Sequence, residues 1–258
     1  NEYLFPKIGL DTTDQVAFAS LRFASLRFAS ASVRSFVPRT RPSKLGWVRQ
    51  AKGHEVDGQS LNYKGGDDYL TQIQTRSNCQ VAFLGAKGRS YSILGAQLPS
   101  ARGHGEPCTK FFNIDSSQDL LFVVSAELTQ KYLVGSSSGY GFLTPFESMV
   151  SKNKAGKSFI TVAAGGQVLN PVKVDHEDQA QVLVVTQQGR ALLIDITEIP
   201  ELPRGKGNKL VNFHKGDLEK ELDSIAAWTV IKPGDTAVLY TKSRKKRFVY
   251  DELITYQS

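Results

Sequence analysis

Cysteine, methionine and tryptophan are scarce in this sequence, whose 258 residues include two cysteines, one methionine and two tryptophans. Cys79 and Cys108 are too few for a disulfide scaffold or a structural zinc site, so we expect both to be buried as small apolar side chains. No apolar run approaches the roughly 18 residues of a membrane-spanning helix, and the first residues lack the basic-then-apolar order of a signal peptide. A cytoplasmic protein without membrane insertion is the simplest interpretation.

Acidic residues are scarce in the first part of the chain. Residues 1–52 contain nine Lys or Arg but only three Asp or Glu, which gives a net charge of +6. The other 206 residues contain 23 basic and 22 acidic side chains. Binding of a polyanion by this larger part therefore depends on how its charges are distributed over the surface, because their sum is near zero.

A repeat of about 50 residues is present, marked by the glycines Gly88, Gly139 and Gly189, which lie 51 and 50 residues apart. Around each glycine an apolar, β-branched run meets a short polar turn and a second, alternating run, which is typical of a β-hairpin. LGWVRQ (45–50) is interpreted as the second strand of an earlier copy, with Gly46 as its turn residue. The predicted hairpins are 81–94, 132–143, 182–194 and 237–250.

A glycine-containing basic loop recurs with the same period. Taking Gly53, Gly103, Gly156 and Gly205 as equivalent gives spacings of 50, 53 and 49 residues, and a strand is predicted directly after each of the last three loops, at 108–114, 157–162 and 209–213. Two markers with one period, and no strong helical period, predict an all-β fold of small four-stranded sheets in a radial array. The loops are AKGHE (51–55), ARGHGEP (101–107), NKAGKS (153–158) and PRGKGNK (203–209).

The letters AGKS (155–158) also end the phosphate-binding loop of nucleotide hydrolases. That interpretation fails, because the motif needs a glycine at position 151, which is serine, and because KSFITV favours a strand where the motif opens a helix. RGHGEP and RGKGNK, in the same place of the sister repeats, also lack Ser or Thr after Gly-Lys. The four histidines have no metal-ligand spacing, so we predict no catalytic residue and no metal site.

The basic loops instead predict a curved line of cations that can follow a phosphate backbone, with glycines exposing backbone N–H donors. One such loop in isolation is better explained as a soluble turn, but four at one phase of a repeat favour a duplex-DNA interface. Five cations in the turn of the last hairpin extend the prediction. The predicted DNA-binding residues are Arg49, Lys52, Arg102, Lys110, Lys152, Lys154, Lys157, Arg204, Lys206, Lys209, Lys242, Arg244, Lys245, Lys246 and Arg247.

Acidic residues recur 12 to 19 residues after each basic loop. They are Asp67 and Asp68, Asp115 and Asp119, Asp175 to Asp178, and Asp217 to Asp223. This pattern predicts a basic turn and an acidic turn at opposite ends of every repeat.

From about Lys44 to about Leu253 the chain resembles the C-terminal domain of ParC, the A subunit of bacterial topoisomerase IV, which is a paralogue of the gyrase A C-terminal domain. The segments that carry the resemblance are GWVRQAKGHEVDG, GRSYSILGAQLPSARGHGEP, GYGFLTPFESMVSKNKAGKSFITV and GRALLIDITEIPELPRGKGNK. The resemblance implies a β-pinwheel, a propeller-like disc of about five four-stranded blades, whose basic rim binds and bends duplex DNA.

The resemblance also implies a place in a type II DNA topoisomerase that decatenates DNA and relaxes supercoils. This domain would present a DNA segment to the cleavage core, and its partners would be the B subunit of topoisomerase IV and a second copy of ParC. The catalytic tyrosine, ATP and magnesium would belong to other parts of the enzyme, so this domain alone should use no cofactor and be inactive. The gyrase box Gln-Arg-Arg-Gly-Gly-Lys-Gly is matched only in part, by Pro203–Gly207, so we expect bending of DNA without chiral wrapping.

Residues 1–42 lie outside both the repeat and the resemblance. FASLRFASLRFAS (18–30) repeats with a period of five, which matches neither a strand nor a helix. We therefore divide the chain into residues 43–258, the β-pinwheel domain, and residues 1–42, a basic segment that is either a linker or a source of closing strands. The alternative function is a propeller-like module that binds proteins and no DNA.

Overall fold

The computed structural model describes residues 21–23, 39–42, 46–51, 62, 65, 73–100, 103–115, 120–163, 165–175, 179–213, 223–240 and 245–256. The chain divides into two compact units. Unit 1 comprises residues 1–29, 131–144 and 162–258, and unit 2 comprises residues 30–130 and 145–161. No helix in the described ranges is long and apolar enough to cross a bilayer.

Unit 2 contains two antiparallel sheets of four strands, in the orders β4-β2-β3-β7 and β11-β6-β5-β8. Short 3-10 helices follow some of its strands: η2 (Gly95–Gln97), η3 (Cys108–Lys110) and η5 (Phe146–Met149). The strands are β2 (Arg39–Pro42), β3 (Trp47–Ala51), β4 (Ile73–Gln74), β5 (Gln80–Gly85), β6 (Arg89–Leu94), β7 (Glu106–Pro107), β8 (Leu120–Val124) and β11 (Lys157–Ser158).

Unit 1 contains three sheets, in the orders β12-β9-β10-β15, β14-β13-β16 and β1-β17-β18. Its helices are η6 (Ile196–Glu198), α2 (Tyr250–Leu253) and η7 (Ile254–Tyr256). The strands are β1 (Leu21–Phe23), β9 (Lys131–Ser136), β10 (Tyr140–Pro145), β12 (Val172–Lys173), β13 (Gln181–Thr186), β14 (Ala191–Asp195), β15 (Asn208–Lys209), β16 (Ile225–Ile231), β17 (Thr236–Tyr240) and β18 (Lys245–Val249).

Five small sheets, each built around one hairpin, confirm the predicted all-β class and the number of blades. The four predicted hairpins are β5–β6, β9–β10, β13–β14 and β17–β18, and β2–β3 is the earlier copy. Three sheets have four strands and two have three strands within the described residues.

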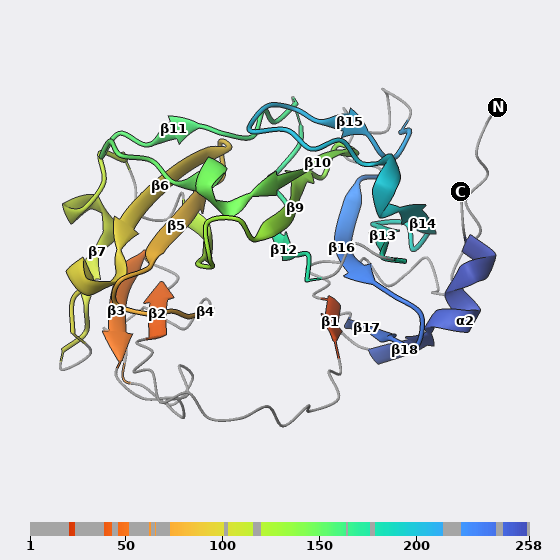
Figure 1. The fold of residues 1–258 in the computed structure, drawn as a ribbon, viewed down its shortest axis with the longest axis horizontal. Coiled ribbons are helices and arrows are strands. Elements are labelled where there is room, and N and C mark those ends of the chain that lie inside the picture. Colours follow the sequence, from red (N-terminus) through yellow and green to blue (C-terminus); the bar gives the residue numbers. More distant parts are fainter. Residues whose placement is uncertain are drawn as a thin grey trace. The chain divides into compact units, whose positions relative to one another are not determined.

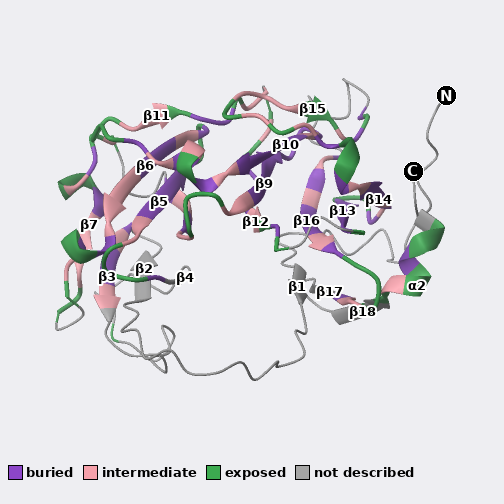
Figure 2. Ribbon diagram, viewed as in Figure 1, coloured by how far each residue is buried: buried purple, intermediate pink, exposed green. Residues whose placement is uncertain are grey.

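The first strands of the β5–β6 and β13–β14 hairpins are buried on both faces and contain an apolar run, VAFL in β5 and VLVV in β13. All six residues of β13 are buried, as are five of the six in β5. Figure 2 shows these strands in purple, with the exposed residues in the turns and connectors. The apolar side chains of unit 2 meet around Phe83, Tyr91 and Phe112, and those of unit 1 around Leu133, Val184 and Trp228.

The outer strand of three sheets comes from the next repeat along the chain. β7 joins β3, β11 joins β6 and β15 joins β10, each after a basic loop. In Figure 1 the green β11 lies beside the yellow β6, and the blue β15 lies beside the green β10. We call β7, β11 and β15 donated strands.

The strands predicted after the basic loops are therefore present but much shorter than expected. β11 and β15 have two residues each, and the segment 108–114 is not a strand, because β7 ends at Pro107 and η3 begins at Cys108. The donated strands end early because the next residues cross the hairpin turn of the sheet they join. The inner strands β8, β12 and β16 were not predicted, because the sequence patterns used mark only hairpins and loops.

The N-terminal segment contributes two strands to these sheets. β1 pairs with β17, and β2 is the first strand of the β2–β3 hairpin, so the predicted boundary between residues 42 and 43 falls within that hairpin. β2 was not predicted because Arg-Thr-Arg-Pro lacks the apolar run and the alternation that are typical of a strand.

Candidate nucleic-acid interface

Each donated strand is held by the turn of the hairpin that it joins. In unit 2 the carbonyl oxygen of Gly88 accepts hydrogen bonds from the N–H groups of Phe159 (3.0 Å) and Ile160 (2.8 Å). Gly156, directly before β11, has a φ of 64°, and a Cβ there would lie 2.6 Å from the Ser90 carbonyl oxygen. We call residues 87–90 and 152–160 the β6–β11 corner.

Unit 1 repeats this arrangement with different residues. The carbonyl oxygen of Gly139 accepts hydrogen bonds from Leu210 (2.8 Å) and Val211 (3.2 Å). Gly207, directly before β15, has a φ of 79°, and a Cβ there would lie 2.2 Å from the Gly141 carbonyl oxygen. We call residues 138–141 and 204–211 the β10–β15 corner.

The structure corrects the glycines that define the basic loop. Gly105, Gly156 and Gly207 each have positive φ and directly precede a donated strand, and they lie 51 residues apart. Sequence analysis aligned Gly103 and Gly205 with Gly156, two residues too early, because Gly103-His-Gly105 and Gly205-Lys-Gly207 each offer two glycines. The structure shows that the second glycine of each pair directly precedes the donated strand, and that a Cβ there would lie close to a backbone oxygen, at 2.5 Å for Gly105 and 2.2 Å for Gly207.

The β6–β11 corner gathers several cations. Lys87 is exposed in the hairpin turn, and Lys152 and Lys154 are exposed in the loop before β11. Lys157 is half-buried and lies opposite Ser90 in the sheet. Arg89 donates from one Nη to the carbonyl oxygens of Ala155 (2.7 Å) and Gly156 (3.2 Å). Sequence analysis missed Lys87 and Arg89 because they belong to the preceding repeat, and strand donation alone brings them to this loop.

The β10–β15 corner presents Arg204 and Lys209, which are exposed, and Lys206, which is half-buried. The Lys206 ammonium lies 3.8 Å from the centroid of the Tyr140 ring, a cation–π contact. Tyr140 lies opposite Lys209 in the sheet. Three predicted cations are therefore brought together within one short loop.

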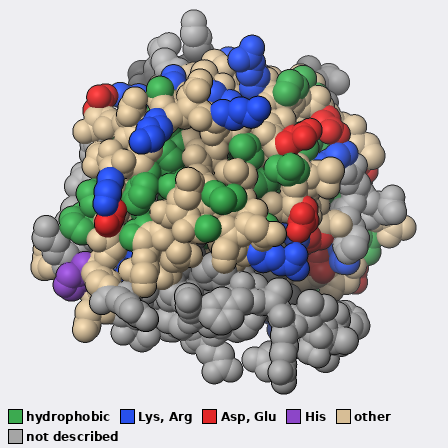
Figure 3. Space-filling model, turned by 60° about the vertical axis from the view of Figure 1, so that its left-hand side comes forward, with side chains coloured by type: hydrophobic (Ala, Val, Ile, Leu, Met, Phe, Trp, Pro, Cys, Tyr) green, Lys and Arg blue, Asp and Glu red, His purple; other side chains and the backbone are tan. Residues whose placement is uncertain are grey.

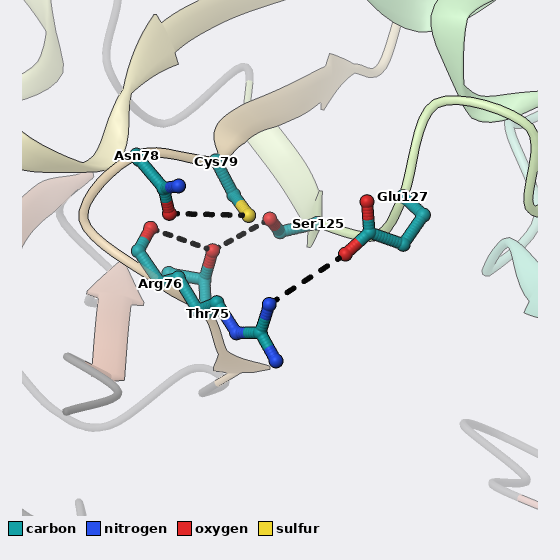
Figure 4. Close-up of polar contacts among 6 residues, drawn as sticks. All are labelled: Thr75, Arg76, Asn78, Cys79, Ser125 and Glu127. Carbon is teal, nitrogen blue, oxygen red and sulfur yellow. Dashed lines mark hydrogen bonds and ion pairs between the residues drawn. The ribbon is translucent and has the colours of Figure 1, made fainter. Parts of the chain in front are cut away.

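Three cations elsewhere in the described ranges are paired with carboxylates. The Arg76 guanidinium lies 4.0 Å from Glu127, beside the hydrogen-bonded pair Thr75–Ser125 that Figure 4 shows. Lys131 lies 2.8 Å from Glu201, and Lys173 pairs with Asp175. Among the same described residues, no ion pair neutralises Lys87, Lys152, Lys154, Arg204, Lys206 or Lys209. Exposed Lys and Arg side chains are visible on the face drawn in Figure 3.

Two predicted residues have contacts within the protein. Arg49 is only 5% exposed, and it donates hydrogen bonds to the carbonyl oxygens of Gly103 (3.0 Å) and Asn62 (2.9 Å). The Lys110 ammonium lies 2.6 Å from Glu106 on the same connector. We therefore leave the buried Arg49 out of the proposed interface, whereas Lys110 is exposed and stays a predicted contact.

The remaining predicted cations are placed only in part. Arg247 is exposed on β18, and Lys245 and Lys246 belong to the same strand. Lys52, Arg102, Lys242 and Arg244 lie outside the described residues.

The predicted separation of basic and acidic turns is wrong for two repeats. The N–H of Asn113, two residues before the exposed Asp115, donates to the carbonyl oxygen of Lys154 at 2.9 Å, so this acidic segment adjoins the basic loop. Asp223 is 3% exposed beside the Gly189 turn, where its carboxylate accepts hydrogen bonds from Gln188 N–H (3.2 Å) and Ser224 N–H (3.0 Å). Asp223 thus supports a turn and is not a surface charge.

The cysteines differ from one another. Cys108 is fully buried, as predicted, and burial raises the pKa of its thiol to about 12. Cys79 is partly exposed beside Asn78 (Figure 4), so the prediction of burial is wrong for this residue.

Comparison with known proteins places this architecture in a family. A solved structure described as the E. coli ParC C-terminal domain superposes with a TM-score of 0.79 at 35% identity, covering 87% of this chain and 91% of that one. The chain belongs to the ParC C-terminal domain family. The family model named DNA gyrase C-terminal domain, beta-propeller, matches residues 180–232, and a gyrase A C-terminal domain shares the fold with a TM-score of 0.61 at 13% identity.

Full-length relatives extend well beyond this domain. The A subunit of DNA topoisomerase 4 from Escherichia coli is 36% identical over 211 residues, 82% of this chain and 28% of the relative. The corresponding Haemophilus influenzae protein is 37% identical over 203 residues, 79% of this chain and 27% of the relative. The chain thus spans about 28% of the length of the relatives that it matches. Membership of the ParC C-terminal domain family confirms the predicted β-pinwheel class.

Proposed function

We propose that this chain is a duplex-DNA-binding domain of a type II DNA topoisomerase, which contacts phosphates without reading sequence. The observation that carries the proposal is the contrast between two sets of cations. Six cations of the β6–β11 and β10–β15 corners have no carboxylate partner among the described residues, whereas Arg76, Lys131 and Lys173 each have one. Lysines without a carboxylate partner, gathered on short loops, suit a phosphate backbone.

Within the complete enzyme, the proposed role is to bend a DNA segment and present it to the cleavage core for decatenation and supercoil relaxation. The proposed partners are the B subunit of topoisomerase IV and a second copy of the ParC protein, in the bacterial cytoplasm. The domain itself would use no cofactor and would not relax supercoiled DNA alone, since ATP and magnesium act elsewhere in the enzyme.

The test is a titration of labelled duplex DNA at salt concentrations between about 50 and 200 mM. If binding neutralises phosphates, the affinity falls steeply with salt and differs little between sequences. A variant with Arg204, Lys206 and Lys209 changed to Ala should bind more weakly, and its salt slope should fall by roughly 2.7, about 0.9 for each phosphate that is no longer neutralised. Fluorescence anisotropy measures both quantities.

The matched control changes Arg76, Lys131 and Lys173 to Ala, which removes the same charge from sites that are already ion-paired. It should leave the salt slope near that of the unmodified chain. Equal effects of the two triple variants would show that net charge and not the corner controls binding. No binding at low salt, with protein partners retained after nuclease treatment, would favour the protein-interaction alternative.

A further inference from the structure

The residue that follows the turn glycine touches the donated basic loop in both units. Arg89 follows Gly88 and Tyr140 follows Gly139, so the two residues occupy equivalent places 51 residues apart. Each is half-buried, and each lies opposite a residue of the donated strand: Arg89 faces Ser158 and Tyr140 faces Lys209.

Arg89 uses its guanidinium within the protein. One Nη donates to two successive carbonyl oxygens of the loop, those of Ala155 and Gly156. These carbonyls lie between Lys154 and Lys157, so the hydrogen bonds fix the backbone that carries both lysines. A planar guanidinium can hold two carbonyl oxygens at once, which a flexible lysine ammonium does less well.

Tyr140 reaches the same part of its loop by different chemistry. The centroid of its ring lies 3.8 Å from the ammonium of Lys206, the residue between Gly205 and Gly207. Both glycines have positive φ, 130° at Gly205 and 79° at Gly207, a backbone conformation that other residues rarely adopt. The ring therefore restrains Lys206, whose neighbouring glycines allow many backbone conformations.

We propose that Arg89 and Tyr140 are positioning residues, which hold the donated loops so that their lysines face phosphate and which do not themselves contact DNA. This inference rests on the proposed DNA-binding function. A loop fixed before binding loses less conformational freedom on binding, so its affinity is higher at the same number of charges. The expected signature is a change in affinity without a change in salt slope.

The test compares Arg89→Lys and Arg89→Ala by anisotropy with labelled duplex DNA across the same salt range. Both variants should bind several-fold more weakly than the unmodified chain, and both should keep its salt slope, because Arg89 does not itself neutralise a phosphate. Lys154→Ala is the matched reference for a direct phosphate contact, and its slope should fall by about 0.9. Amide hydrogen exchange at residues 154–157 should accelerate in both Arg89 variants.

Tyr140 is tested by Tyr140→Phe, which keeps an aromatic ring, and Tyr140→Leu, which removes it. We expect Tyr140→Phe to bind like the unmodified chain, and Tyr140→Leu to bind several-fold more weakly with an unchanged slope. Thermal unfolding of each variant separates loss of positioning from loss of fold.

Three results would overturn the proposal. If Arg89→Lys restores full affinity while Arg89→Ala lowers both affinity and slope, Arg89 contacts phosphate directly. If neither Arg89→Ala nor Tyr140→Leu changes affinity while the unmodified chain binds DNA, the residues have no role in binding. Weaker binding explained wholly by a lower unfolding temperature shows a structural role only. Failure of the unmodified chain to bind at low salt rejects the proposed function itself.

Discussion

The β6–β11 corner of unit 2 and the β10–β15 corner of unit 1 share one backbone and differ in almost every side chain. In each, a turn glycine accepts two N–H groups from the residues after the donated strand, and a second glycine allows the loop to approach the hairpin. Arg89 in one corner is replaced by Tyr140 in the other, and Phe159 is replaced by Leu210.

The difference teaches that glycine conformation fixes strand donation, whereas the cations on the loop are free to vary. Lysines occupy different places in the two loops, at 152, 154 and 157 in one and at 206 and 209 in the other. A phosphate chain can be followed by cations at varied positions, because its charge is spread along its length. Only the backbone has to be the same.

The largest effect is expected from replacing the loop glycine in each corner. Gly156→Ala and Gly207→Ala would place a Cβ within 2.6 and 2.2 Å of a backbone oxygen, in a conformation that L residues avoid. Each should lower the free energy of unfolding by about 2–4 kcal/mol, measured by urea denaturation. The control is Gly103→Ala, where nothing lies within 4 Å of the new Cβ. If only one of the two substitutions lowered the free energy of unfolding this much, the two corners would not be equivalent.

A second variant asks whether the two corners contribute equally to DNA binding. Lys87, Lys152 and Lys154 changed together to Ala should lower the salt slope by roughly 2.7, as in the Arg204, Lys206 and Lys209 variant. The Lys87, Lys152 and Lys154 variant should leave the free energy of unfolding within about 0.5 kcal/mol of the unmodified chain, because these side chains are exposed. The other triple variant also removes the contact of the half-buried Lys206 with Tyr140, so its unfolding is measured beside its binding. An unchanged slope for one of them would show that only one corner binds phosphate.

A third prediction extends the comparison to the Gly189 turn, where β14 has no donated strand among the described residues and Asp223 supports the turn. Asp223→Ala leaves two N–H groups without their acceptor and should cost about 1–3 kcal/mol of unfolding free energy. Asp223→Asn keeps an oxygen acceptor and should cost less. Thermal or urea unfolding of both variants provides the comparison.

The difference in stability between the unmodified chain and Asp223→Asn should depend on pH, because the pKa of Asp223 is shifted in the folded chain. Burial raises this pKa, although hydrogen bonds from Gln188, Thr186 and Ser224 and the charge of Arg190 oppose the shift. The folded chain then binds a proton at this site at higher pH than the unfolded chain does, so protonation adds stability as the pH falls through the folded-state pKa. The unmodified chain should therefore gain stability relative to Asp223→Asn on acidification. A constant difference between the two would contradict this shift.

The hairpins could be predicted from the sequence, because their apolar runs and turn glycines are local signals. The period of Gly88, Gly139 and Gly189 was sufficient to predict an all-β repeat, and the dense basic loops were sufficient to select Lys154, Lys206 and Lys209 as candidates. Each of these inferences depends only on residues close together in the chain.

Only the tertiary structure decided which residues meet. Strand donation joins Lys87 and Arg89 to a loop more than 60 residues later, and no local pattern records that pairing. Packing of segments distant in the chain also buries Arg49 and Asp223, which by composition alone are surface charges. Long-range pairing of this kind depends on backbone hydrogen bonds and on glycines at positive φ, and Gly103 and Gly105 are the same letter in the sequence although only the second adopts that conformation.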